Sequence, residues 1–171
     1  GVSNETSIEI LRELYRPLNL RETPLVFTDL ESAELIKYAS NAFLAMKISF
    51  INEMADLCEK TGGNVQMVAK GMGLDNRIGS KFLHPGPGFG GSCFPKDTRA
   101  LYNSFKKFKV KNSLVKSTIE FNERRKLQMV SKIRKILGKN IQIKRIAFLG
   151  VTFKPNTDDL RESPSLVIIP E

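Results

Sequence analysis

An uninterrupted helical pattern from residue 29 to residue 60 constrains the fold of this chain more than any other feature. Thr28 and Glu31 have the spacing of a capping box at its start, and Gly62-Gly63 supplies an end. At about 1.5 Å per residue this helix is roughly 45 Å long. Apolar residues occupy most of its circumference, so several of its sides must be covered. We therefore expect a mainly helical fold whose helix 29–60 joins two copies of the chain in a homodimer.

The rest of the chain carries shorter patterns. Four further helices are expected: one from Thr6 to Pro17, one capped by Asn64 that ends near Gly71 or Gly73, one that starts near Pro95, and one over 113–137 that Gly138 ends. Residues 25–27 form a short strand-like run. Residues 145–150 form an apolar run that ends in Gly, which predicts a buried strand at the start of a βαβ unit. A lone parallel strand cannot pair its backbone, so we expect the sequence to be cut off.

Charge favours an anionic partner, because 27 Lys and Arg face 18 Asp and Glu, a net charge of +9. The basic residues concentrate in 106–111, 124–126 and 132–145, mostly at helical spacing, where a solvated face is the simpler explanation. No RNA-binding motif or zinc-finger spacing accompanies them. We expect no nucleic-acid binding, although a basic binding module remains an alternative. No uncharged stretch is long enough for a membrane helix, and no signal segment opens the chain, so we expect a cytoplasmic protein without membrane contact.

A glycine- and proline-rich loop over residues 84–95 contains Gly86-Pro-Gly88-Phe-Gly90-Gly91, which matches G-x-G-x-x-G. The dinucleotide-binding interpretation fails, because that motif requires a strand before it and an apolar helix that opens within it. The glycines instead offer a loop whose backbone amides can approach a ligand closely. A purely structural turn is the alternative.

The two cysteines differ in setting and form neither a zinc set nor a disulfide framework, so no metal is expected. Cys58 lies within the apolar helix, as a small hydrophobic residue would. Cys93 ends the glycine loop near the expected helix start, with Lys96 close by and Asp97 four residues on. A helix start and a nearby cation favour the thiolate, which is the nucleophilic form. Cys93 is therefore a candidate nucleophile, with an inert cysteine as the alternative.

Lys37 and Asn41 are four residues apart and share one face near the start of the long helix. A solvated first turn would explain this pair. The functional interpretation is a cation and an amide that face a developing oxyanion.

Several segments resemble the UDP-glucose/GDP-mannose dehydrogenase family. They are Glu34-Leu-Ile-Lys37-Tyr-Ala-Ser-Asn41-Ala-Phe-Leu-Ala, Arg77-Ile-Gly, Phe82-Leu, Gly88-Phe-Gly-Gly-Ser-Cys93-Phe-Pro-Lys96-Asp97, Phe148-Leu-Gly-Val-Thr-Phe153-Lys154 and Asp158-Asp-Leu-Arg161-Glu-Ser163. Members that act on GDP-mannose usually carry Leu at the position of Phe94. Phe94 and Arg77-Ile-Gly therefore favour UDP-glucose, with GDP-mannose or another nucleotide sugar as the alternative.

The resemblance implies an NAD-dependent oxidation of the sugar C6 alcohol to a carboxylate, which turns UDP-glucose into UDP-glucuronate in two hydride transfers. Cys93 would attack the aldehyde, and the thiohemiacetal would become a thioester that water hydrolyses. Lys37 and Asn41 would stabilise oxyanions, and Asp97 would assist the base chemistry.

The resemblance also implies contacts with ligands. The residues that would bind the nucleotide sugar are Lys37, Asn41, Arg77, Phe82, Leu83, His84, Pro85, Gly86, Gly90, Phe153 and Lys154, with Arg77 reaching the sugar of the neighbouring subunit. Lys96 and Arg161 would contact NAD.

The family's first domain, with its own G-x-G-x-x-G, has no counterpart here. We expect residues 1–28 to be the tail end of an N-terminal α/β domain, 29–140 a central helical domain with the cysteine loop, and 141–171 the start of a C-terminal UDP-binding domain. NAD would then be bound mainly outside this chain, and the isolated chain is expected to be inactive. The alternative from another class is a non-catalytic dimerisation scaffold.

Overall fold

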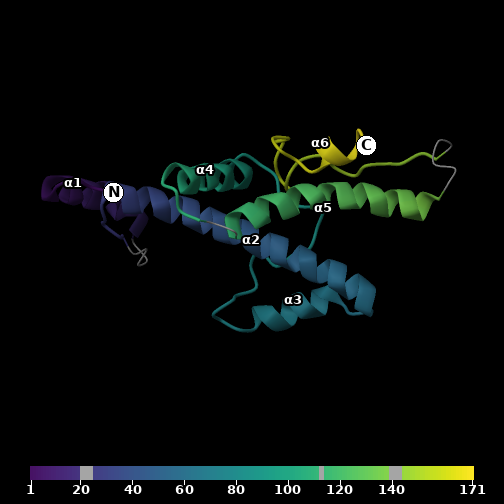
Figure 1. Cartoon of the computed structure of the whole chain (residues 1–171). Helices are drawn as coiled ribbons and strands as arrows, with labels where there is room; N and C mark the ends of the chain where they lie inside the picture. The colour runs from purple at the N-terminus through teal and green to yellow at the C-terminus, as the bar shows by residue number, and fades with distance from the viewer. Residues whose placement is uncertain (20–24, 112–113, 139–143) are drawn as a thin grey trace. The chain divides into compact units, whose positions relative to one another are not determined.

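The computed structural model describes residues 1–19, 25–111, 114–138 and 144–171 (Figure 1). Two compact units make up the chain, Gly1–Ser40 and Asn41–Glu171. The long helix α2 (Leu30–Thr61) contributes residues to both. The described residues are mainly helical, as the sequence predicts. The domain boundaries at 28 and 140 stay a prediction, since compactness alone does not define a domain.

In the first unit, α1 (Glu5–Tyr15) begins where the side chain of Asn4 accepts a hydrogen bond from the Ser7 amide at 2.8 Å. A 3₁₀ turn, η1 (Arg16–Asn19), continues it through Pro17. The helix expected from Thr6 to Pro17 is therefore confirmed within one or two residues. Residues 25–27 form no strand, and the prediction there was wrong.

The start of α2 corrects one detail of the capping prediction. Asp29, not Thr28, caps the helix, because its carboxylate accepts the Ser32 amide at 2.6 Å. That backbone hydrogen bond is the largest cause of the lowered pKa of Asp29. The helix ends at Thr61, followed by Gly62 with φ +78°, a left-handed conformation that glycine adopts without strain.

The remaining helices lie in the second unit: α3 (Val65–Gly73), α4 (Cys93–Lys107), α5 (Leu114–Leu137) and α6 (Ser165–Ile168). Asn64 caps α3, as predicted, by accepting the amides of Gln66 and Met67. The helix α4 begins two residues before Pro95, which falls in its first turn, where a proline costs no hydrogen bond. Residue 113, the expected start of α5, lies outside the described residues.

The predicted strand over 145–150 is not formed, and no strand occurs among the described residues. Residues 145–150 are exposed and irregular. A buried strand needs a neighbouring strand to pair its amides and carbonyls. No other described segment supplies one.

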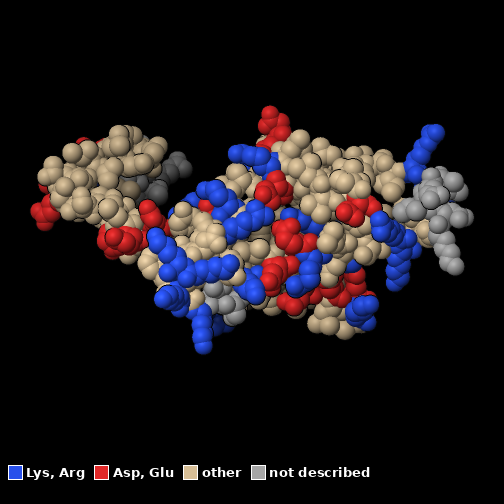
Figure 2. Space-filling view, turned by 45° about the horizontal axis from the view of Figure 1, so that its top comes forward, with Lys and Arg blue, Asp and Glu red and all other residues tan. Residues whose placement is uncertain are grey.

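The second unit is built around α2. Its hydrophobic core contains Ile51, Ala69 and Leu83, which join α2 to α3 and to the loop after it. On the other side of α2 lies α5 (Figure 1), bonded to it by ion pairs from Arg125 and Lys132 to Asp56. Lys132 also pairs with Glu59. Some residues of the basic clusters thus bind acidic groups of the same chain, and basic and acidic side chains are interspersed on the face in Figure 2.

Two further findings concern the described residues. None of their helices combines the length and the apolar character that crossing a bilayer requires. No group of three or more His, Cys, Asp or Glu among them is placed to hold a metal ion.

Candidate functional site

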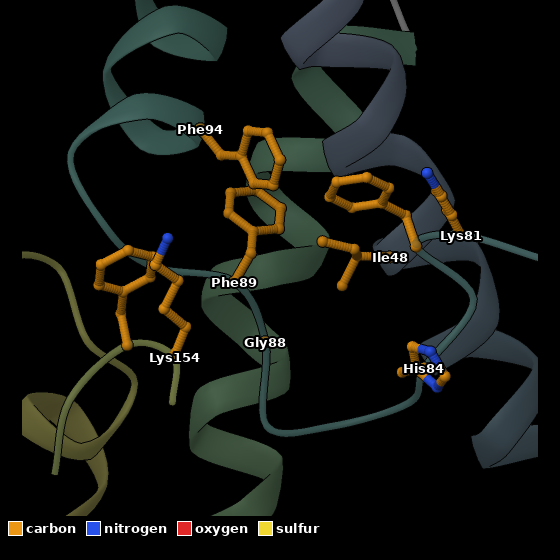
Figure 3. Close-up of a pocket in the computed structure, with 10 residues that line it drawn as sticks. Ile48, Lys81, His84, Gly88, Phe89, Phe94 and Lys154 are labelled. Atoms are coloured by element: carbon orange, nitrogen blue, oxygen red, sulfur yellow. The ribbon is translucent and has the colours of Figure 1, made fainter. Parts of the chain in front are cut away.

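A pocket of about 500 Å³ lies beside the glycine-rich loop (Figure 3). Its wall is mostly aromatic and aliphatic, with cations at two positions. The lining residues are Ile48, Lys81, Phe82, His84, Gly88, Phe89, Gly90, Phe94, Phe153 and Lys154. Phe94 packs edge-on against both Phe82 and Phe89, with ring centroids 5.9 and 6.0 Å apart. An apolar pocket with a few polar groups is typical of a small-molecule site.

The C-terminal segment packs on the loop so closely that two glycines are required. A Cβ on Gly90 would lie 2.2 Å from the carbonyl oxygen of Glu162. A Cβ on Gly91, whose φ is +81°, would lie 2.7 Å from the Phe153 ring. The Gly91 amide also donates to the Arg161 carbonyl at 2.8 Å. This contact brings Phe153 and Lys154 to the pocket, although they lie about sixty residues after the loop in sequence.

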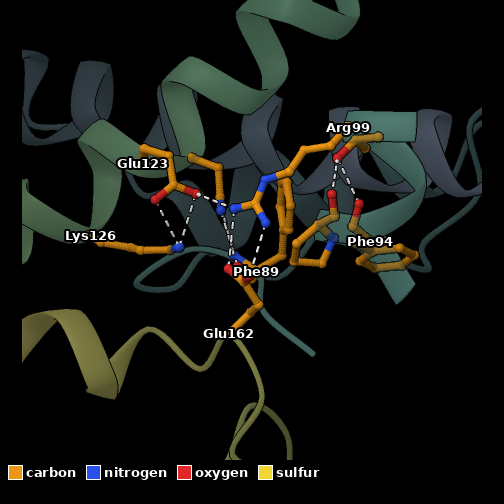
Figure 4. Close-up of polar contacts among 9 residues, drawn as sticks. Phe89, Phe94, Arg99, Glu123, Lys126 and Glu162 are labelled. Atoms are coloured by element: carbon orange, nitrogen blue, oxygen red, sulfur yellow. Dashed lines mark hydrogen bonds and ion pairs between the residues drawn. The ribbon is translucent and has the colours of Figure 1, made fainter. Parts of the chain in front are cut away.

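A cluster of charged side chains also binds the C-terminal segment, through Glu162 (Figure 4). The guanidinium of Arg99 on α4 donates to both carboxylate oxygens of Glu162. Glu123 on α5 lies 3.9 Å from Arg99 and also binds the buried Lys126 at 3.0 Å. The cluster therefore links α4, α5 and the C-terminal segment.

Cys93 is exposed and is the first residue of α4, whereas Cys58 is half-buried. The residues on either side of Cys93 line different pockets: Phe94 lines the aromatic pocket, and Ser92 lines a second one. Arg161 lies close enough for Cys93 to contribute to its raised pKa, after the larger effects of its hydrogen bond and charge interaction with Asp159. The residue is thus exposed to solvent, and Arg161 lies within electrostatic range of it.

Asn41 and Asp97 form a buried pair one turn into α4. The side-chain amide of Asn41 donates to Asp97 Oδ2 at 2.5 Å, and Lys96 Nζ lies 3.0 Å from Asp97 Oδ1. Only 7% of Asn41 and 2% of Asp97 is exposed. Lys37 precedes Asn41 by one turn of α2 but belongs to the first unit, where its side chain is exposed. Its proximity to Cys93 stays a prediction.

The other predicted site residues do not all lie at the aromatic pocket. Phe82, His84, Gly90, Phe153 and Lys154 line the aromatic pocket, whereas Leu83 is buried in the core of the second unit. Pro85 and Gly86 belong to the loop but are not among the lining residues. Arg77 lies elsewhere, at a smaller pocket that includes Phe43, and pairs with Asp75 at 2.6 Å.

Lys96 and Arg161 both line the second pocket, of about 880 Å³, together with Ser92 and Arg99. The hydrogen bond from Arg161 lowers the pKa of Asp159 to about 2, and the same bond raises the pKa of Arg161. Arg161 therefore carries its charge at any ordinary pH.

Comparison with known proteins identifies the family. The family model of the UDP-glucose/GDP-mannose dehydrogenase central domain matches residues 31–124. The model of that family's UDP-binding domain matches residues 147–171.

This chain belongs to the UDP-glucose/GDP-mannose dehydrogenase family.

Three relatives illustrate the similarity. A UDP-glucose 6-dehydrogenase of Rhizobium meliloti is 58% identical over 161 residues, which are 94% of this chain and 37% of the relative. The structure of a UDP-glucose dehydrogenase from Pyrobaculum islandicum aligns with a TM-score of 0.88 at 36% identity, over 98% of this chain and 38% of that one. An NDP-N-acetyl-D-galactosaminuronic acid dehydrogenase from Methanosarcina mazei aligns with a TM-score of 0.80 at 29% identity, over 98% and 38%. The chain therefore spans between a third and two fifths of the length of these relatives.

Sequence reasoning missed several residues of the aromatic pocket and of the charge cluster beside it. Ile48, Lys81, Phe89 and Phe94 line the pocket, and Arg99 and Glu162 hold the segment that closes it. Phe89 and Phe94 lie on either side of Cys93 within the motif of residues 88–97. Their place in that motif was the only sequence signal that they belong to the site. Nothing in the sequence pairs Arg99 with Glu162, which lie 63 positions apart.

Proposed function

We propose that this chain is the central part of a UDP-glucose 6-dehydrogenase that oxidises UDP-glucose to UDP-glucuronate with NAD⁺. The observation that carries the proposal is the position of Cys93, exposed at the start of α4, where its neighbours Phe94 and Ser92 line two pockets. The family membership and the names of the relatives support the substrate.

Cys93 acts as the nucleophile in this proposal. Its thiolate attacks C6 at the aldehyde level: the C–S bond forms as the carbonyl π electrons move to oxygen, and protonation gives a thiohemiacetal. Loss of the C6 hydride, for which NAD⁺ would be the acceptor, and of the hydroxyl proton would convert this species to a thioester. Water then attacks the thioester carbon, the C–S bond breaks, and the thiolate returns as the carboxylate is released. An exposed cysteine whose neighbour Phe94 lines the pocket suits each of these steps.

Asn41, Lys37 and Asp97 support this chemistry. Each attack on C6 creates an oxyanion, which an amide or an ammonium group can stabilise. The hydrogen bond from Asn41 to Asp97 fixes the orientation of the amide. Asp97 is the group that we propose for the activation of water, and Lys96 lies against its other oxygen.

The aromatic pocket is the proposed site of the sugar nucleotide. Phe82, Phe89 and Phe94 offer apolar and edge-on surfaces for rings. Lys81 and Lys154 are cations that fit a diphosphate. His84, Pro85, Gly86 and Gly90 provide further groups of the same loop.

The second pocket fits part of NAD. Lys96 and Arg161 are exposed cations on one open surface, next to the start of α4, and such a surface suits a pyrophosphate. When bound, NAD⁺ accepts hydride. The remainder of the cofactor would be held outside the described residues.

The dimer remains a proposal. Phe43, Phe50 and Leu57 are exposed on α2, which leaves apolar surface for a second copy of the helix. Arg77 lies next to Phe43 and Phe50 and would reach the sugar nucleotide of the partner. We place the enzyme in the cytoplasm, where the free thiols of Cys58 and Cys93 stay reduced.

The test uses the full-length protein that contains this chain. We expect formation of NADH from UDP-glucose, with much lower kcat/KM for GDP-mannose, and a loss of at least about 1,000-fold in kcat on Cys93→Ala. Cys58→Ala should retain activity. Turnover by the Cys93→Ala enzyme at the wild-type rate would refute the mechanism, and preference for GDP-mannose would refute the substrate. The isolated 171-residue chain should form no NADH.

A further inference from the structure

Side chains hold the turn 86–89 of the glycine-rich loop in place. The Gly86 amide donates to Asn52 Oδ1 at 2.7 Å, and the Gly86 carbonyl accepts from Arg125 Nε at 3.0 Å. The Phe89 amide donates to Asn122 Oδ1 at 2.7 Å, and its carbonyl accepts from Asn122 Nδ2 at 3.1 Å. At each end of the turn 86–89, the backbone amide and the backbone carbonyl are therefore both hydrogen-bonded to side chains.

The three residues that bind the turn are almost inaccessible to water: 1% of Asn52, 2% of Asn122 and 4% of Arg125 is exposed. A polar side chain buried to this extent is costly unless its hydrogen bonds are made. Here the partners are the loop amides and carbonyls. The bonds are therefore a built feature of the fold and would not be replaced by water without rearrangement.

Gly88 also lies against Asn122, and its lack of a side chain makes the bond to Phe89 possible. Its φ is +120°, and a Cβ there would lie 2.9 Å from Asn122 Oδ1. Asn122 can reach Phe89 only because Gly88 leaves this space free. The glycine and the asparagine, on different elements, therefore depend on each other.

Arg125 anchors the turn to the helices. Its Nη1 atom binds Asp56 on α2 at 2.5 Å, while its Nε atom holds the Gly86 carbonyl. Asp56 also accepts a hydrogen bond from Lys132 of α5. The turn is thus fixed to both α2, through Asn52 and Asp56, and α5, through Asn122 and Arg125.

We propose that Asn122, together with Asn52 and Arg125, is a positioning residue for the dehydrogenase reaction. This inference rests on the proposed function. None of the three lines the aromatic pocket, but they hold the turn from which Gly88 and Phe89 line it. The chain continues from this turn through Gly91 and Ser92 directly to Cys93. Fixing the turn therefore shapes the sugar-nucleotide pocket and sets where α4 begins.

The first test measures amide hydrogen exchange, residue by residue, in the 171-residue chain. Asn122→Ala should speed exchange of the Phe89 amide by at least about tenfold and affect the Gly86 amide less; Asn52→Ala should do the reverse. Thr118→Ala is the matched control, because Thr118 is buried on α5 but its hydroxyl bonds to Leu114 of the same helix. It should leave both amides protected. Equal acceleration of both amides in both variants would overturn the proposal, since general destabilisation acts on the whole turn.

The second test uses the full-length enzyme. Asn122→Ala should raise KM for the nucleotide sugar by at least about fivefold and change KM for NAD⁺ by less than about twofold. A merely destabilised enzyme would lose active molecules and keep both KM values, and that result would overturn the positioning role. If the wild-type enzyme oxidises no nucleotide sugar, the proposed function fails, while the exchange pattern still decides whether these residues fix the turn.

Discussion

Arg99 and Glu162 form a two-bond ion pair between α4 and the C-terminal segment, with Nη1–Oε1 and Nη2–Oε2 distances of 2.8 and 3.2 Å. Parallel bonds of this kind fix orientation as well as distance. The pair lies at the same segment whose Phe153 closes the aromatic pocket. Removing one partner of this pair should therefore weaken the attachment of the C-terminal segment to α4.

The first prediction concerns pH. The hydrogen bond from Arg99 is the largest cause that lowers the pKa of Glu162 below its ordinary value of 4.5. A depressed folded-state pKa adds stability above pH 4.5, which is lost as pH falls through the lower folded value. Both side chains are partly exposed, so Glu162→Gln should lower Tm at neutral pH by only about 2 °C. The difference should disappear in acid, as thermal unfolding followed by circular dichroism would show. Glu9→Gln, at an exposed site, should behave as wild type; an undiminished difference in acid would contradict the assignment.

Cysteine reactivity gives the second prediction. Cys93 is exposed and Cys58 is half-buried, so iodoacetamide should modify Cys93 first. The rates can be compared by mass spectrometry of digested samples taken over time. Cys93→Ala should remove the fast phase, and Cys58→Ala should leave it intact. Faster labelling of Cys58 would show that the Cys93 sulfur is less accessible than the structure has it.

The third prediction tests the buried pair of Asn41 and Asp97. Asn41→Ala removes the amide that donates to a carboxylate with 2% exposure. A buried acceptor that loses its donor costs about 1–3 kcal/mol, so the free energy of unfolding should fall by that amount in urea titrations. Asn103→Ala, on an exposed face of α4, should change it by less than about 0.5 kcal/mol. Equal effects of the two variants would contradict the importance of the hydrogen bond.

Two glycines give the fourth prediction. Gly90→Ala would place a methyl group 2.2 Å from the Glu162 carbonyl oxygen, so the backbone must move, at a cost of about 1–3 kcal/mol. Gly71, inside α3, has open space around it, and Gly71→Ala should stabilise the chain by up to about 1 kcal/mol. Urea unfolding of both variants provides the measurement. A neutral Gly90→Ala would mean that the C-terminal segment does not contact the loop.

The helices could be predicted from sequence because their determinants are local. Asn64 caps α3 and Gly138 follows α5, as expected. The strand over 145–150 could not be judged in this way, because strand formation depends on a partner elsewhere. The cap of α2 was misplaced by one residue, since Thr28 and Asp29 are both good capping residues and only the backbone decides between them.

The candidate site was predictable only in part, for a similar reason. Cys93 and its glycine loop are contiguous in sequence, so their pattern is visible. The bonds of Asn122 to Phe89 and of Arg125 to Gly86 join residues 33 and 39 positions apart. An asparagine or arginine within a helical pattern carries no mark of the loop that it will bind. Such residues are found only once the helices are placed in space.

The walls of the aromatic pocket are attached in two different ways. Phe89 is held by buried hydrogen bonds to Asn122. Phe153 belongs to a segment that is joined to the loop by one hydrogen bond, from the Gly91 amide, and to α4 by the partly exposed pair of Arg99 and Glu162. Pulling that segment away would uncover the cavity while the hydrogen bonds of Asn122 to the turn stay in place, but it would also remove Arg161 from the neighbourhood of Cys93. The two walls should therefore differ in local stability, because releasing Phe153 breaks partly exposed contacts whereas releasing Phe89 breaks buried hydrogen bonds.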